Sequence, residues 1–182
     1  MASERISQIM KLLLFVFISF IFISFNLKNA YASSSYVLPY PGIMPGNKVY
    51  VVSDFIDTFK GFFAFGDFAS FSYNLSQADK YLIEAKTLFE YKQYLLARDS
   101  LEDSNVSIKK AKNSLDLARK HKKPVVEKTK VFHDAIVKHN EVLVSLLEIL
   151  PADFMWEDEK KAPVKIFIKD DILRAISIRN SL

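Results

Sequence analysis

The sequence predicts an all-α fold: a small helical bundle built on a long antiparallel αα-hairpin and preceded by an extended, proline-rich arm. Apolar residues recur at steps of three and four along two long segments, which is the spacing of a buried helix face. A short break joins these segments, so the two helices should lie antiparallel. Half of the six prolines and half of the four glycines fall within residues 36–46, where a helix is therefore not expected.

Residues 1–32 have the layout of a secretory signal peptide. Arg5 and Lys11 give a positive start, residues 12–25 are almost wholly apolar, and Ala30 and Ala32 form the small-x-small pattern read by signal peptidase. The apolar run is short for a membrane span of about 20 residues. The alternative is an uncleaved anchor over residues 9–27. Both interpretations predict an extracytoplasmic protein, either secreted or membrane-anchored.

Residues 33–48 form the predicted arm. Three prolines fix φ and remove N–H donors, which keeps the segment extended at low entropic cost. We expect the arm to lie along the hairpin and to bury Leu38, Tyr40 and Ile43, with Gly42 and Gly46 at the turns. The alternative is a proline-rich ligand for an aromatic groove of a partner, although the proline spacing lacks a P-x-x-P repeat.

A first helix is predicted over residues 49–63, with glycines weakening its end. Seven phenylalanines lie between Phe55 and Phe71, and we expect them to pack in the core. A membrane-lying helix is the alternative. Such helices carry Lys and Arg on the polar face, whereas this region carries Asp54, Asp57 and Asp67 against Lys60.

The hairpin follows, with a break expected within residues 90–94. Small and large apolar residues alternate along both seams, so the two helices can approach closely. The first seam comprises Phe71, Leu75, Ala78, Leu82, Ala85 and Phe89, and the second comprises Ala97, Leu101, Ser104, Ile108, Ala111, Leu115 and Ala118.

A third long helix is predicted between Pro124 and Pro151, and it completes a helical bundle core over residues 49–150. Residues 151–182 are expected to form an acidic link and a C-terminal helix. The stretch VKIFIK, residues 164–169, alternates like a strand. We assign it to the final helix because a lone strand would have no partner. Asp170 and Asp171 are expected to cap that helix at its N-terminus.

The charge balance argues against nucleic acid as a partner. Residues 1–32 carry three basic residues and one acidic residue, so the remainder has a net charge of only +2. One basic stretch remains at residues 109–130. Its candidates for anion contact are Lys109, Lys110, Lys112, Arg119, Lys120, Lys122 and Lys123. We favour a solvated helix end and turn over a binding site, because cations suit the C-terminal helix dipole.

Candidate catalytic and metal-binding residues are few, so no enzyme activity and no cofactor are predicted. The chain has no cysteine and three histidines. His133 and His139 lie six positions apart, whereas zinc-binding pairs on a helix prefer four. His139 falls on the apolar stripe and is expected to be a hydrogen-bonded core histidine. The acidic residues at 153 and 157–159 lack the spacing of a calcium loop and fit a solvated link.

The opening motif resembles that of a family of bacterial envelope proteins known as domain of unknown function 5667. The residues that carry the motif are Leu38, Pro39, Tyr40, Pro41, Gly42, Pro45 and Tyr50, followed by Asp57 and by ADKYLIEA at 78–85. The resemblance covers roughly residues 36–120 and implies a secreted or anchored helical domain, with no reaction assigned. Met44, Ile56 and Tyr81 depart from the family pattern, in which a Leu and two Arg are usual.

The sequence therefore predicts a non-enzymatic, extracytoplasmic helical domain with an interaction or structural role. It would bind an envelope protein, or a second copy of itself, through a helix face. The alternative is a peripheral membrane or anionic-polymer binder that uses residues 109–130. Salt separates these two, because charge-driven binding weakens with ionic strength while apolar contact changes little.

Overall fold

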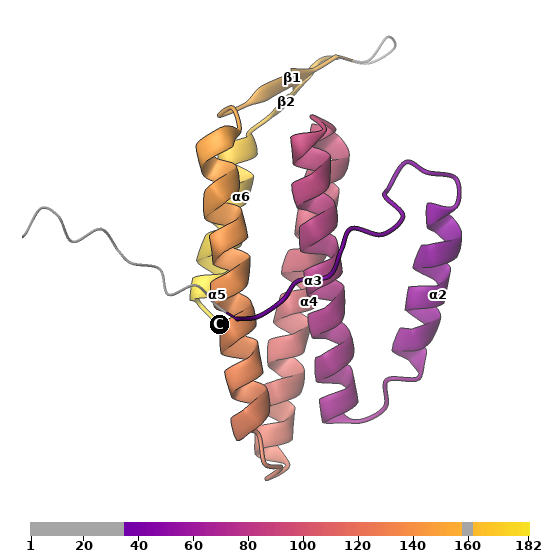
Figure 1. The fold of residues 1–182 in the computed structure, drawn as a ribbon, viewed down its shortest axis with the longest axis vertical. Coiled ribbons are helices and arrows are strands. Elements are labelled where there is room, and N and C mark those ends of the chain that lie inside the picture. Colours follow the sequence, from indigo (N-terminus) through magenta and orange to yellow (C-terminus); the bar gives the residue numbers. More distant parts are fainter. Residues whose placement is uncertain (1–34, 158–161) are drawn as a thin grey trace, which may run out of the picture. The chain divides into compact units, whose positions relative to one another are not determined.

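The computed structural model describes residues 35–157 and 162–182 of the chain (Figure 1). The predicted signal peptide, with Ala30 and Ala32, lies outside these residues. In chain order the elements are α2 (Tyr50–Phe62), α3 (Asp67–Glu90), α4 (Tyr94–Lys120), α5 (Val126–Ile149), β1 (Phe154–Trp156), β2 (Val164–Ile166) and α6 (Ile168–Asn180). The predicted mostly helical bundle is confirmed. Within the described ranges, none of the helices is long and apolar enough to span a bilayer.

The α3–α4 hairpin is the centre of the bundle, as predicted. Every residue of the two predicted seams is buried, and the two helices lie side by side along their length (Figure 1). Alanines at 78, 85, 97, 111 and 118 have no exposed surface, which lets the two backbones approach closely. The connection is short because Lys92, two residues after the end of α3, adopts a left-handed conformation with φ of 60° and turns the chain.

Helices α5 and α6 pack against this hairpin and complete the core (Figure 1). One apolar cluster includes Leu82, Leu101, Leu143 and Ile172. A second cluster lies towards the start of α3 and the end of α4, around Phe71 and Leu115. Buried residues of α5 include Phe132, Leu143 and Leu146, on the predicted stripe.

The assignment of residues 164–169 to a helix was wrong for the first four of them, because α6 begins only at Ile168. Val164–Ile166 forms β2, which pairs antiparallel with β1, and Phe154 lies opposite Ile166. The partner strand lies in the stretch that we had assigned to a connection. The sheet is tied to the bundle because Ile166 is buried against the core and because the ring of Phe154 lies 4.8 Å from that of Tyr94. Helix α6 begins at Ile168 with Phe167 as its N-cap and no side-chain cap hydrogen bond, so the prediction that Asp170 and Asp171 cap it was wrong. Both acids lie in its first turn, where negative charge suits the helix dipole.

The arm runs extended in front of the bundle, but it buries different residues from those predicted. Leu38 is half-buried and packs against the core, as expected. Tyr40 is 96% exposed and Ile43 is also exposed, so the prediction that they pack was wrong. Tyr36 and Met44 take these places against the two core clusters. Gly46 turns the chain with φ of 94°, whereas Gly42 needs no left-handed backbone.

Candidate functional site

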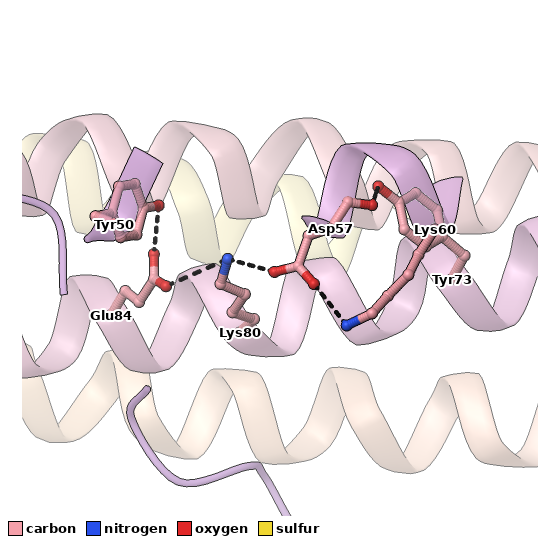
Figure 2. Close-up of polar contacts among 6 residues, drawn as sticks. All are labelled: Tyr50, Asp57, Lys60, Tyr73, Lys80 and Glu84. Carbon is pink, nitrogen blue, oxygen red and sulfur yellow. Dashed lines mark hydrogen bonds and ion pairs between the residues drawn. The ribbon is translucent and has the colours of Figure 1, made fainter. Parts of the chain in front are cut away.

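Helix α2 meets α3 through polar groups (Figure 2). The Tyr50 hydroxyl donates a hydrogen bond to Glu84 Oε2 at 3.1 Å. Lys80 Nζ lies 2.8 Å from Asp57 Oδ2 and 3.6 Å from Glu84 Oε1. The same ammonium group lies 5.4 Å from the centroid of the Tyr50 ring. Lys80 of α3 therefore contacts both Tyr50, at the start of α2, and Asp57, in its middle.

Asp57 is the centre of this interface. Its carboxylate pairs with Lys80 and, at 2.9 Å, with Lys60 of its own helix. Its backbone carbonyl accepts a hydrogen bond from the Tyr73 hydroxyl at 3.0 Å. Burial disfavours ionisation of Asp57, but the hydrogen bonds and charges of the two lysines outweigh that effect and lower its pKa. Gly61 permits the close approach, because a Cβ there would lie 2.6 Å from the Tyr73 ring.

The apolar side of α2 faces outward. Among the α2 side chains that the structure describes, none is buried. Phe55 and Phe62 are 70% and 71% exposed, and Phe65, just beyond the helix, is 73% exposed. The aromatic patch comprises Phe55, Phe59, Phe62, Phe63 and Phe65, whose rings contact one another at centroid distances of 4.9–6.5 Å.

The prediction that the seven phenylalanines pack in the core was therefore wrong for five of them. Phe71 is buried and Phe68 is half-buried, as expected for residues of α3. The other five are outside because the side of α2 that faces α3 carries Tyr50 and Asp57. Helical periodicity alone identifies an apolar face but does not say which neighbour that face meets.

The predicted anion-contact residues lie along the last half of α4 and in the turn to α5. Several have acidic partners: Asp116 pairs with Lys112 and Arg119, and Asp67 pairs with Lys123 and His121. Hydrogen bonds from His121 and Lys123 lower the pKa of Asp67. Lys109, Lys110, Lys120 and Lys122 are exposed. They form no ion pair with the side chains of residues 35–157 or 162–182.

The α2–α3 connection, which carries Phe63 and Phe65 of the patch, lies at the same end of the bundle as the α4–α5 connection, residues 121–125, here called the basic turn (Figure 1). Asp67, two residues after Phe65, accepts from His121 Nδ1 at 2.7 Å and from Lys123 Nζ at 2.9 Å. Lys123 also lies over the Phe68 ring, 5.6 Å from its centroid. This proximity could not be predicted from the sequence, because it depends on the antiparallel hairpin that brings the start of α3 to the end of α4.

The motif residues fall into two groups. Pro39, Tyr40, Pro41 and Gly42 are exposed, whereas Leu38, Pro45 and Tyr50 are half-buried. Tyr50 belongs to the α2–α3 interface, and Leu38 packs on the core. The exposed group therefore needs an explanation other than packing within this part of the chain.

A separate polar network lies inside the bundle. His139 Nε2 donates to Asp79 Oδ1 at 2.7 Å, and His139 Nδ1 accepts from Arg179 Nε at 3.2 Å. Arg179 also donates to Asn105 Oδ1 and to Ser104 Oγ. The Tyr36 hydroxyl donates to Asp79 Oδ2 at 2.6 Å. The network joins the arm to α3, α4, α5 and α6. The sequence predicted burial of His139 and Ser104 but not their polar partners.

The network holds a neutral histidine between two opposite charges. Burial lowers the pKa of His139 below its ordinary value, and the nearby Arg179 acts in the same direction. Burial also lowers the pKa of Arg179 to about 10, so its guanidinium remains charged at neutral pH. Because Asp79, His139 and Arg179 are all buried, the network presents no reactive group to solvent. The residues described hold no group of three or more metal-ligating side chains.

Comparison with known proteins gives one match. The family model called Domain of unknown function (DUF5667) matches residues 42–153, which is more than half of the chain. No curated protein and no solved structure matches the chain. The match begins within the arm and spans α2 to α5, so it includes both the aromatic patch and the basic turn. The chain belongs to the DUF5667 family.

Proposed function

We propose that this protein is a non-enzymatic, extracytoplasmic docking domain that attaches to another surface through the outward apolar face of α2. The bundle provides a rigid support, and α2 presents the contact. Extracytoplasmic placement rests on the signal-like residues 1–32, and the absence of an assembled nucleophile or metal set in the sequence supports a binding role.

The observation that carries the proposal is the orientation of α2. An amphipathic helix on a soluble bundle normally turns its apolar stripe towards the core. Here Tyr50 and Asp57 face α3, and the aromatic patch faces out. Contiguous exposed apolar surface of this kind marks interaction sites in folded proteins. Aromatic side chains are also enriched at the centres of interfaces.

Photo-cross-linking in living cells tests the docking role. A photoreactive amino acid placed at Phe62, which is 71% exposed, should give adducts with another molecule of the envelope. The matched control is the same group at Tyr91, which is 73% exposed and lies at the opposite end of the hairpin. Adducts from position 62 alone support the proposal. Equal labelling from both positions, or none from position 62, contradicts it.

A further inference from the structure

We infer that the surface on which α2 docks is a lipid bilayer that carries anionic headgroups. This inference rests on the proposed docking role of α2 and names the partner of that face. The observation that carries it is the presence of two features at one end of the bundle: the C-terminal part of the aromatic patch, and a group of lysines that have no acidic partner within residues 35–157 and 162–182.

The aromatic patch has the chemistry of an interfacial anchor. Its rings contact one another, at 4.9 Å for Phe59 and Phe63 and at 5.4 Å for Phe62 and Phe63. An interfacial helix buries its apolar face by about 5–10 Å in the boundary between headgroups and acyl chains. Helix α2 can do so without unfolding, because its opposite, polar side is already bonded to α3.

Lysines at the same end of the bundle supply positive charge. Lys120 ends α4, Lys122 lies in the α4–α5 connection, and Lys128 and Lys130 lie in the first turns of α5. None of the four forms an ion pair within residues 35–157 and 162–182. They are exposed, apart from Lys128, which is half-exposed. Basic residues near an anionic membrane surface strengthen attachment additively. The lysines and the phenylalanines can therefore bind the same bilayer together.

The carboxylates at this end cancel only part of that charge. Glu127, which is exposed in the first turn of α5, offsets one of the four lysines. Asp57 is paired with Lys60 and Lys80, and Asp67 is paired with His121 and Lys123. Asp116 is paired with Lys112 and Arg119. The acidic residues that argued against a membrane-lying helix in the sequence are thus neutralised, where described, by cations of the folded bundle.

The charge is what favours a bilayer over a protein partner. Phenylalanines alone would fit an apolar groove of another protein equally well. A second copy of this chain would bring a second set of lysines to the contact, and like charges in close proximity oppose association. An anionic bilayer satisfies both features, because it has negative headgroups above an apolar interior.

The test uses a fluorescent label at one of two matched positions in the full chain. The chain has no cysteine, so a single introduced cysteine is labelled uniquely. Phe65→Cys replaces one ring of the aromatic patch by an environment-sensitive dye, and Tyr91→Cys places the dye at the opposite end of the hairpin. Both native side chains are 73% exposed. Each protein is titrated with vesicles of phosphatidylcholine alone or with phosphatidylglycerol added.

We expect the dye at position 65 to shift to the blue with anionic vesicles and the dye at position 91 not to shift. Comparing two positions in one chain separates contact at this end from attachment through any other segment. The triple variant Phe55→Ser, Phe59→Ser, Phe62→Ser should weaken binding at least about tenfold, because these rings no longer enter the bilayer. Its thermal unfolding should be unchanged, since all three side chains are exposed.

A lysine pair provides the control for charge. Lys92 and Lys122 each occupy the left-handed position after a helix, with φ of 60° and 57°, but at opposite ends of the hairpin. Lys122→Gln should weaken vesicle binding roughly fivefold, and Lys92→Gln should leave it unchanged. Equal effects of the two variants, equal binding to neutral vesicles, or shifts at both dye positions would overturn the bilayer assignment.

The outcomes also separate this inference from the proposed function. No shift at position 65 with anionic vesicles, together with protein adducts from position 62 in cells, overturns the bilayer and retains the docking role. Self-association that the triple serine variant abolishes leads to the same conclusion, with a second copy as the partner. No shift at position 65 and no adducts from position 62 overturn both.

Discussion

Arg179 places a full positive charge inside the bundle, where it is 1% exposed. It has no direct ion pair among the described residues; His139 lies between it and Asp79 and bonds to both. The neutral imidazole with its proton on Nε2 fits this arrangement, since Nδ1 accepts from Arg179 and Nε2 donates to Asp79. Both hydrogen bonds of His139 therefore depend on its imidazole remaining neutral.

Removal of Arg179 should be strongly destabilising. Arg179→Met removes the cation that faces Asp79 through His139, and leaving a buried charge uncompensated in this way costs about 3–5 kcal/mol. Urea denaturation of the variant and of the wild-type protein measures this difference. Arg174→Met is the control, because Arg174 pairs with Glu102 and Asp171 at the surface, and such pairs contribute about 1 kcal/mol or less. Equal losses in both variants would contradict the role of the network.

His139 should make the fold sensitive to mild acid. Its pKa is lowered in the folded protein, so below about pH 6.5 the unfolded chain binds a proton that the folded chain does not. The free energy of unfolding should therefore fall as the pH drops from 7 to 5. In His139→Asn, which does not titrate there, this fall should be smaller, although the variant is less stable at pH 7. Urea denaturation at each pH measures this fall in the free energy of unfolding. His133 is exposed, so His133→Asn is the control and should keep the pH dependence of the wild-type protein.

At the scale of elements, α3 and α4 end in the same way. After each helix a lysine takes a left-handed conformation, and the next residue donates its N–H to a carbonyl five positions earlier: Gln93 to Leu88, and Lys123 to Ala118. This is the Schellman pattern, in which glycine is the usual left-handed residue. A lysine is strained there because its Cβ approaches the carbonyl oxygen. The hairpin tolerates that strain because the seams on both sides are fully buried.

Replacing the left-handed lysine by glycine should stabilise the hairpin. Lys92→Gly removes the steric cost of the left-handed conformation and should raise the free energy of unfolding by about 0.5–1 kcal/mol. Thermal and urea denaturation both measure the change. Lys92→Ala retains a Cβ and is the matched control, which should give no gain. A gain of the same size with alanine would show that the lysine side chain, rather than the backbone conformation, causes the cost.

At the scale of the whole molecule, the arm contacts both apolar clusters of the core as well as the buried polar network. Tyr36 bonds to Asp79 of the buried network, and burial beside that carboxylate raises the pKa of Tyr36 far above its ordinary value. Leu38 and Met44 pack against the apolar cluster that includes Leu82 and Leu101. The arm therefore covers the hairpin before the chain turns into α2. Because these contacts hold the arm on the bundle, they also fix the position of the first residue of α2.

Deletion of residues 33–43 should lower the Tm by about 5–10 °C. The deletion removes a hydrogen bond to a buried carboxylate and the burial of Leu38, which together contribute about 3 kcal/mol. Differential scanning calorimetry gives the Tm. Tyr40→Ala is the control and should have no effect, since Tyr40 is 96% exposed. An unchanged Tm after the deletion would sink the packing role and leave the exposed prolines as a ligand for a partner.

The helices could be predicted from the sequence because their signals are local. The seams from Phe71 to Phe89 and from Ala97 to Ala118 repeat at helical spacing, and the structure buries all of them. The two strands could not be predicted because their signal is not local. Val164–Ile166 forms a strand only because Phe154–Trp156 pairs with it, and such pairing depends on residues distant in sequence.

The sequence by itself determined the helical bundle, its hairpin, the extended arm and the core position of His139. Each follows from periodicity, from proline chemistry or from the burial preference of one side chain. Only the tertiary structure decided that α2 turns its aromatic side outward, that Asp79 and Arg179 flank His139, and that the end of α2 and the α4–α5 connection lie at the same end of the bundle. These features depend on which faces of separate helices meet, because a polar contact such as that of Asp57 with Lys80 can reverse the side that an amphipathic helix presents to its neighbours.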